Sequence, residues 1–220
     1  LNFSISYSKE RDIMNKYKEI KKDLKNIDLC IVTKNRSKEE IMHYYNLNER
    51  IFGENRAQEL LTKVDLPNDI KWHFIGRLQT NKVRSILPYV DCIQSVDSLR
   101  LAKFINKEAK RIDKVVNVLI QFNLSQEETK TGLSYEDAFD FFKQCEELTN
   151  INIKGIMLMG PNVDDKEEIK KVFKQGRELF DSLKLKYNTL DTLSMGMSDD
   201  YKLAIEENTT MVRIGSILFN

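Results

Sequence analysis

Cysteine, proline and glycine are all scarce in this chain of 220 residues. The three cysteines, Cys30, Cys92 and Cys145, lie far apart without a Cys-x-x-Cys pair, which argues against a disulfide framework or a zinc site and favours a reducing compartment. No apolar run approaches the length of a membrane span, and the polar N-terminus is unlike a secretory signal. We therefore expect a cytoplasmic protein with no membrane partner.

An excess of charge of either sign is also lacking. The chain has 35 Lys and Arg against 34 Asp and Glu, for a net charge of +1. This balance gives no electrostatic argument for a nucleic-acid partner, and we expect none. Runs of mixed sign, such as residues 18–25 and 164–171, are typical of solvated helix faces.

Short apolar runs alternate with helical segments along the chain. The apolar runs are "LCIVTK" (29–34), "RIFGE" (50–54), "IKWHFIG" (70–76), "DCIQSV" (91–96), "VVNVLIQFN" (115–123), "NIKGIMLMG" (152–160), "DTLSMG" (191–196) and "TMVRIGS" (210–216). A helix is expected near 9–26, and others near 37–46, 55–64, 79–89, 98–112, 134–149, 165–187 and 199–207. Such alternation implies parallel strands, so we predict a single α/β domain over residues 1–220, folded as a (β/α)₈ TIM barrel.

Two further patterns refine this fold prediction. An open doubly wound sheet is the alternative, but the turn after the first run is "TKNRS", which lacks the glycines of a dinucleotide-binding turn. Several helices are expected to begin at residues whose side chains cap a helix N-terminus. These residues are Ser37, Asn55, Ser98, Ser134 and Ser198.

Lys34 ends the first apolar run, and barrel active sites lie at the C-terminal ends of the strands. Apolar walls and neighbouring cations lower the pKa of a lysine, which gives a neutral amine that can attack a carbonyl carbon. The alternative is a lysine whose ammonium group simply reaches solvent from the strand end.

Small residues follow the last two runs, in "SMGMS" (194–198) and "IGS" (214–216). Barrels often bind phosphate after strands seven and eight, where glycine lets the backbone approach an anion and serine donates hydrogen bonds. Two ordinary tight turns are the alternative.

Strand alternation places Arg213 on the same face as Gly215, toward the barrel interior. A buried arginine needs a partner, which is either a ligand atom or an acid such as Glu54. His73 lies on the third run, where a satisfied core or rim histidine is the favoured interpretation.

Five stretches of this chain together resemble one family. They are "LCIVTK", "FGENRAQE", "WHFIGRLQTNK", "IQSVDSLRLA" and "LSMGMSDDYKLAIEENTTMVRIG". They look like the pyridoxal phosphate homeostasis protein family, and the resemblance covers about residues 29–219. It implies a TIM barrel of the alanine racemase type, here with an extra N-terminal helix, that binds pyridoxal 5′-phosphate (PLP).

The resemblance also implies roles for individual residues. Lys34 would form a Schiff base with PLP, and Arg213 would face the pyridine nitrogen and keep it unprotonated, which makes the cofactor a weaker electron sink. Phosphate would be held by Ser194, the following backbone at Met195, Gly215 and Ser216, while Asn55 and Met159 would line the pocket. The sequence departs from the family pattern at Asn35-Arg36-Ser37, where Thr/Phe-x-Pro is common, and at Arg56, where tyrosine is usual.

The family resemblance implies a carrier and buffer of PLP rather than an enzyme, with PLP-dependent apoenzymes as recipients. Racemases of this fold add a C-terminal β domain that supplies a tyrosine base and a dimer surface, whereas this chain stops after the eighth run, so we expect a monomer. A PLP-dependent amino-acid racemase remains an alternative, with His73, Tyr201 or Tyr45 as a second acid or base. Another is a sugar-phosphate enzyme that uses Lys34 without PLP.

Overall fold

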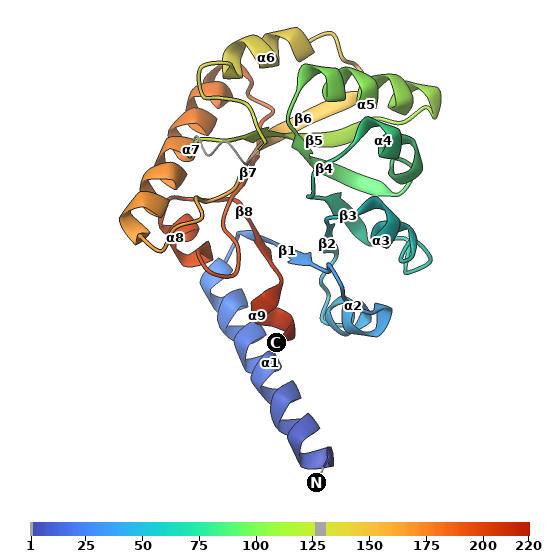
Figure 1. The fold of residues 1–220 in the computed structure, drawn as a ribbon, viewed down its shortest axis with the longest axis vertical. Helices are drawn as coiled ribbons and strands as arrows, with labels where there is room; N and C mark the ends of the chain where they lie inside the picture. Colours follow the sequence, from blue (N-terminus) through green and yellow to red (C-terminus); the bar gives the residue numbers. More distant parts are fainter. Residues whose placement is uncertain (1, 126–130) are drawn as a thin grey trace.

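Eight parallel strands close into a barrel in chain order, β1 to β8 (Figure 1). The computed structural model describes residues 2–125 and 131–220. The strands are β1 (Asp28–Val32), β2 (Ile51–Glu54), β3 (Lys71–Phe74), β4 (Val90–Val96), β5 (Val116–Phe122), β6 (Ile151–Leu158), β7 (Thr192–Ser194) and β8 (Met211–Ile214). Each lies within or beside one of the eight apolar runs, so the predicted barrel is confirmed.

Helices surround the barrel (Figure 1). They are α1 (Asn2–Leu24), α2 (Lys38–Tyr45), α3 (Ala57–Leu61), α4 (Thr80–Ile86), α5 (Leu99–Arg111), α6 (Ala138–Cys145), α7 (Lys166–Lys186), α8 (Tyr201–Glu206) and α9 (Ser216–Phe219). All but α9 correspond to helices expected from the sequence. In residues 2–125 and 131–220, no helix is both long and apolar enough to cross a membrane.

The N-terminal helix α1 packs against the helices that follow β7 and β1. In the described part of the chain, the helix after β8 is the four-residue α9. Tyr201 of α8 donates a hydrogen bond to Asp23 at 3.1 Å, and the Tyr17 ring packs 5.5 Å from that of Tyr44 on α2. Helix α1 therefore spans the gap between the helices that follow β7 and β1, and completes the ring around the barrel.

The apolar core has two parts. The larger part lies between the barrel and its helices, where side chains such as Phe52, Phe173 and Phe180 are fully buried. Each such side chain contributes roughly 1.5–3 kcal/mol through removal of apolar surface from water. Cys92, Leu119 and Met157 form a separate small cluster on β4, β5 and β6. The barrel interior also holds buried polar side chains, among them Gln94, Ser194 and Arg213.

Two of the predicted helix caps are confirmed. Ser37 forms a capping box with Glu40, in which Glu40 N donates to Ser37 Oγ at 3.2 Å and Ser37 N donates to Glu40 Oε2 at 2.7 Å. Ser98 accepts a hydrogen bond from Leu101 N at the start of α5. Such caps stabilise a helix by about 1 kcal/mol because they satisfy N–H groups that have no partner within the helix.

The other three caps lie elsewhere than predicted. Helix α3 has Arg56 at its N-cap and α8 has Asp200, so the predictions for Asn55 and Ser198 are wrong. Ser134 accepts a hydrogen bond from Asp137 N, but in a turn before α6, whose N-cap is Asp137 itself. In each case the helix begins later than the first polar residue of the loop.

Candidate functional site

Lys34 lies in a tight turn just beyond the C-terminal end of β1. Arg36 N donates to Thr33 O at 3.0 Å and closes this turn. Asn35 has a φ of 58°, in the left-handed region that asparagine tolerates better than most residues. The Lys34 side chain is exposed. The structure therefore places this lysine at the mouth of the barrel, as the sequence predicts.

The end of β8 packs directly on the strand that leads to Lys34. Arg213 is paired with Cys30 across β8 and β1. A Cβ atom added to Gly215 would lie 3.1 Å from both Cβ and the carbonyl oxygen of Val32, a tight contact that Val32 would have to relieve by shifting a few tenths of an ångström. Glycine at this position thus brings Ser216 and the Lys34 turn to the same part of the mouth.

Ser198 joins the segment after β7 to the segment after β8. Its hydroxyl accepts a hydrogen bond from Gly215 N at 3.3 Å. The turn between them and β7 is tight because Gly196 has a φ of 94°, and a Cβ there would lie 2.6 Å from Ala204 Cβ. The sequence interpretation took Ser198 only as a helix cap. Its position in the small-residue stretch "SMGMS" is the sequence signal that could have pointed to its contact with Gly215.

Arg213 and Ser194 face each other inside the barrel. Nη1 of Arg213 donates to the carbonyl oxygen of Ser194 at 2.9 Å and to its Oγ at 2.7 Å, and Nη2 donates to Leu158 O at 2.8 Å. Arg213 is 4% exposed, and burial lowers the pKa of its guanidinium. Of the two partners expected, Glu54 is excluded in this structure because its carboxylate pairs with Lys63.

A chain of hydrogen bonds continues from Ser194 through the interior. Ser194 Oγ donates to Gln94 Oε1 at 2.7 Å, and Gln94 Nε2 donates to His73 Nδ1 at 2.8 Å. Burial lowers the pKa of His73 to about 4, so its ring is neutral at neutral pH. Because Nδ1 accepts, the ring proton is on Nε2, which lies 3.8 Å from Asp91 Oδ2. The interpretation of His73 as a satisfied core histidine is confirmed.

The remaining predicted site residues lie in three different settings. Asn55 follows β2, and its side-chain Oδ1 is buried without a hydrogen-bond partner among the described residues. Met159 follows β6 and is 36% exposed. Met195 is fully buried in the core outside the barrel, and its N–H donates to Met211 O at 3.1 Å. The backbone N–H of Met195 is therefore already used, contrary to the expected role.

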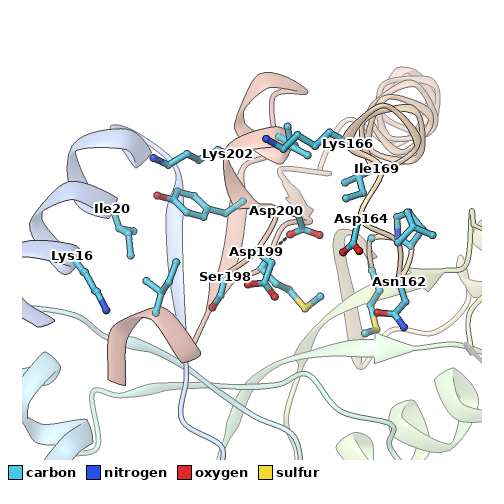
Figure 2. A pocket seen from close by; sticks show the side chains of 18 of the residues that line it. Lys16, Ile20, Asn162, Asp164, Lys166, Ile169, Ser198, Asp199, Asp200 and Lys202 are labelled. Carbon is cyan, nitrogen blue, oxygen red and sulfur yellow. Dashed lines mark hydrogen bonds between the residues drawn. The ribbon is translucent and has the colours of Figure 1, made fainter. Parts of the chain in front are cut away.

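An open cleft of about 910 Å³ lies beside the barrel mouth, between α1, α8 and the segment after β6 (Figure 2). Ser198 and Met159 are part of its lining. Asp199 and Asp200 follow Ser198 on the cleft side, and Asp200 Oδ1 accepts a hydrogen bond from Met197 N at 2.6 Å. Burial raises the pKa of Asp200. Among residues 2–125 and 131–220, no group of three His, Cys, Asp or Glu side chains could hold a metal ion.

Comparisons with known proteins identify the family and agree with the fold. The family model for the alanine racemase N-terminal domain matches residues 10–220. A pyridoxal phosphate homeostasis protein of Aquifex aeolicus is 44% identical over 184 residues, which is 82% of this chain and 81% of that protein. The protein of the same name from Helicobacter pylori strain 26695 is 41% identical over 199 residues, 88% of this chain and 87% of its own. The chain belongs to the pyridoxal phosphate homeostasis protein family.

Solved structures of PipY and of an alanine racemase have the same fold as this homeostasis protein family member. PipY of Synechococcus elongatus, in a structure with PLP bound, has a TM-score of 0.87 and 32% identity, and covers 94% of this chain and 100% of its own. An alanine racemase of Clostridium difficile 630, in complex with cycloserine, has a TM-score of 0.80 at 17% identity, and the match covers 94% of this chain and 59% of the racemase. At that identity the racemase shows the fold alone. The expected family and the alanine racemase type of barrel are both confirmed.

Proposed function

We propose that this protein binds PLP at the barrel mouth and serves as a carrier and buffer of the cofactor. The observation that carries the proposal is the position of Gly215, which donates to the Ser198 hydroxyl and also packs on Val32, two residues before Lys34. Donors suited to a phosphate group thus adjoin the strand end that presents a primary amine. The relatives named for pyridoxal phosphate homeostasis and the PLP-bound PipY support the choice of cofactor.

Each residue at the mouth has a separate role in this proposal. When bound, PLP supplies an aldehyde carbon with which a primary amine condenses reversibly, with release of one water molecule. Lys34 provides that amine. The hydroxyls of Ser198 and Ser216 hold the phosphate together with N–H groups at the start of α9, which have no partner within that helix. Gly215 N–H donates to Ser198 Oγ and so positions that hydroxyl. Arg213 faces the ring nitrogen, where its fixed positive charge disfavours protonation.

The residues that are present fit a cofactor with these groups. Gly215 keeps the space next to Val32 free of a side chain, and Asn55 has a buried oxygen that has no hydrogen-bond partner in residues 2–125 and 131–220. We assign Asn55 and Met159 to the pocket wall. We replace Ser194 by Ser198 as the phosphate residue, because the Ser194 hydroxyl already bonds to Arg213 and Gln94.

The carboxylates on the cleft side of Ser198 determine on which side of this serine the phosphate binds. Asp199 and Asp200 line the cleft next to Ser198, and carboxylates repel a phosphate dianion. The phosphate therefore binds on the side of Ser198 that faces Gly215. Although Asp200 is buried, its carboxylate accepts the Met197 N–H and supports the turn.

We propose that the bound cofactor undergoes no efficient turnover. Racemisation needs a proton donor or acceptor on each face of the substrate carbanion. The three candidates for a second group are occupied elsewhere: His73 bonds to Gln94, Tyr201 to Asp23 and Tyr45 to Asp69. The names of the relatives, which describe homeostasis rather than an activity, support the same conclusion. A PLP-dependent racemase is the alternative. The fold that this chain shares with alanine racemase is compatible with that activity but is not evidence for it.

We further propose a monomer that delivers PLP to apoenzymes in a reducing compartment. Cys30, Cys92 and Cys145 are all free thiols and all buried, which supports a protein that does not depend on disulfides. Burial also raises the pKa of the Cys30 thiol to about 12, so it is protonated and unreactive at neutral pH.

The proposed function is tested by spectroscopy and activity together. Purified protein titrated with PLP should develop an absorbance band of the bound cofactor. The PLP-bound protein should form no products from L-alanine or L-serine. The Lys34→Ala variant should lack the band. Formation of D-alanine by the wild type, and its loss in Lys34→Ala, would contradict the carrier proposal and support the racemase.

A further inference from the structure

We propose that Glu59 and Lys63 are positioning residues that hold the Lys34 turn from the outer side of the barrel. The proposal rests on the proposed role of Lys34 in PLP binding and extends it to side chains that do not touch the cofactor. Glu59 belongs to α3 and Lys63 follows that helix. Both reach the segment after β1.

Lys63 fixes the residue before Lys34. Its Nζ donates to Thr33 O at 2.8 Å, to Glu54 Oε1 at 2.5 Å and to Glu59 Oε1 at 3.0 Å. These three bonds use every donor of the ammonium group. Lys63 is only 4% exposed, and lysine is rarely buried to that extent unless it is paired.

Glu59 fixes the residue after Lys34. The same carboxylate oxygen that pairs with Lys63 also accepts the backbone N–H of Asn35. Thr33, on the other side of Lys34 in the sequence, has a second bond to the network, since its hydroxyl donates to Glu54 Oε1 at 2.5 Å. Both sequence neighbours of Lys34 are thus tied to one network of charged groups, in which Lys63 and Glu54 are buried and Glu59 is partly exposed.

The network lies behind the strand, away from the mouth. Along β1, alternation places Val32 on one face and Thr33 on the other. Gly215 packs on Val32, and the charged network binds Thr33. The Lys34 amine can therefore reach the mouth while its backbone is held from behind.

Stability alone is a poor reason for such a network. Replacement of buried ion pairs by apolar residues of similar volume is often neutral or stabilising, because the charges must be removed from water. Accurate placement of a reacting amine is a better reason, since a shift of about 1 Å at a reactive group can reduce its effectiveness about a hundredfold.

The test compares PLP binding by Glu59→Ala, Glu59→Gln and wild-type protein. Glu59→Ala should raise the Kd for PLP about tenfold or more and slow the appearance of the bound-cofactor band, since a charge-assisted hydrogen bond to the turn is lost. Glu59→Gln keeps an oxygen that can accept the Asn35 N–H, so it should recover part of the affinity. Lys63→Met should behave like Glu59→Ala.

Glu108→Ala is the matched control. Glu108 is a buried carboxylate on α5 whose partners in the described part of the chain are Arg84 and Arg111, neither of which belongs to the Lys34 turn. The Glu108→Ala variant should have a lower midpoint of thermal unfolding, while its PLP spectrum and its affinity for PLP stay at wild-type values. If Glu59→Ala does not fold, Glu59→Gln and Lys63→Met carry the same comparison.

The outcomes separate this proposal from the proposed function. A wild-type protein that gives no band with PLP contradicts both. A wild-type band with unchanged Kd and spectrum in Glu59→Ala overturns the positioning role alone. The role is also overturned if Glu108→Ala weakens PLP binding as strongly as Glu59→Ala does.

Discussion

Arg213 donates to Ser194 twice, to the carbonyl oxygen at 2.9 Å and to the hydroxyl at 2.7 Å. This pair lies inside the barrel, below the turns that reach the mouth. Ser194 is consequently a partner of the arginine, and Ser198 takes the place beside Gly215. The two serines, four residues apart, should therefore respond differently to ligands with and without a phosphate group.

Ser194→Ala should weaken binding of PLP and of pyridoxal by the same factor. The substitution leaves Gln94 Oε1 and one Arg213 N–H without their partner in a buried site. We expect the free energy of unfolding to fall by about 1–3 kcal/mol, measured by urea denaturation. A loss of PLP binding with unchanged pyridoxal binding would show that Ser194 binds the phosphate group.

Ser198→Ala should weaken binding of PLP about tenfold but leave binding of pyridoxal unchanged, because the substitution removes the phosphate contact and the hydrogen bond from Gly215 N but no contact with the pyridine ring. Equilibrium dialysis with the two ligands measures the difference directly. Ser182→Ala is a suitable control, since that half-buried hydroxyl donates to the Glu178 carbonyl one turn earlier in the same helix, α7. Equal losses for both ligands in Ser198→Ala would argue against its assignment.

His73 should make folding less favourable in acid. Its pKa is about 4 in the folded protein against 6.5 in the unfolded chain, so the unfolded chain binds more protons between those values. Stability therefore falls as the pH is lowered from 6.5 to 4, by at most about 1.4 kcal/mol per pH unit from this group. The His73→Gln variant should lose less over that window in urea denaturation, and parallel curves for the two proteins would refute the argument.

Gly196→Ala should destabilise the protein and also weaken PLP binding. The residue has a φ of 94°, and an added Cβ would lie 2.6 Å from Ala204 Cβ and 3.1 Å from Tyr201 Cα. We expect a loss of more than about 1 kcal/mol, because both the backbone conformation and the contact with α8 are unfavourable. Circular dichroism during urea titration measures the loss, and a wild-type midpoint would show that the turn can relax.

The order of strands and helices could be predicted because burial imposes a regular pattern on the sequence. Apolar runs of strand length alternate with amphipathic helices, and a polar first turn without glycine disfavours the open nucleotide-binding sheet. Ser37 could be recognised as a cap because Glu40 completes the capping box. These signals are local, and the structure confirms them.

The partners of the site residues could not be predicted, because they depend on how the barrel closes. Arg213 bonds to Ser194 and to Leu158 O on β6, which lies 55 residues earlier in the chain. Whether Ser194 or Ser198 faces the mouth depends on where β7 ends and on the turn at Gly196. Likewise, the contacts of Lys63 with the Lys34 turn leave no mark in sequence spacing.

Reduction of the protein–PLP complex with borohydride, followed by mass analysis of peptides, tests the central claim most directly. We expect one PLP adduct per chain, on Lys34, and its loss in Lys34→Ala. An adduct on another lysine, labelling spread over several lysines, or no adduct at all would show that Lys34 does not hold the cofactor.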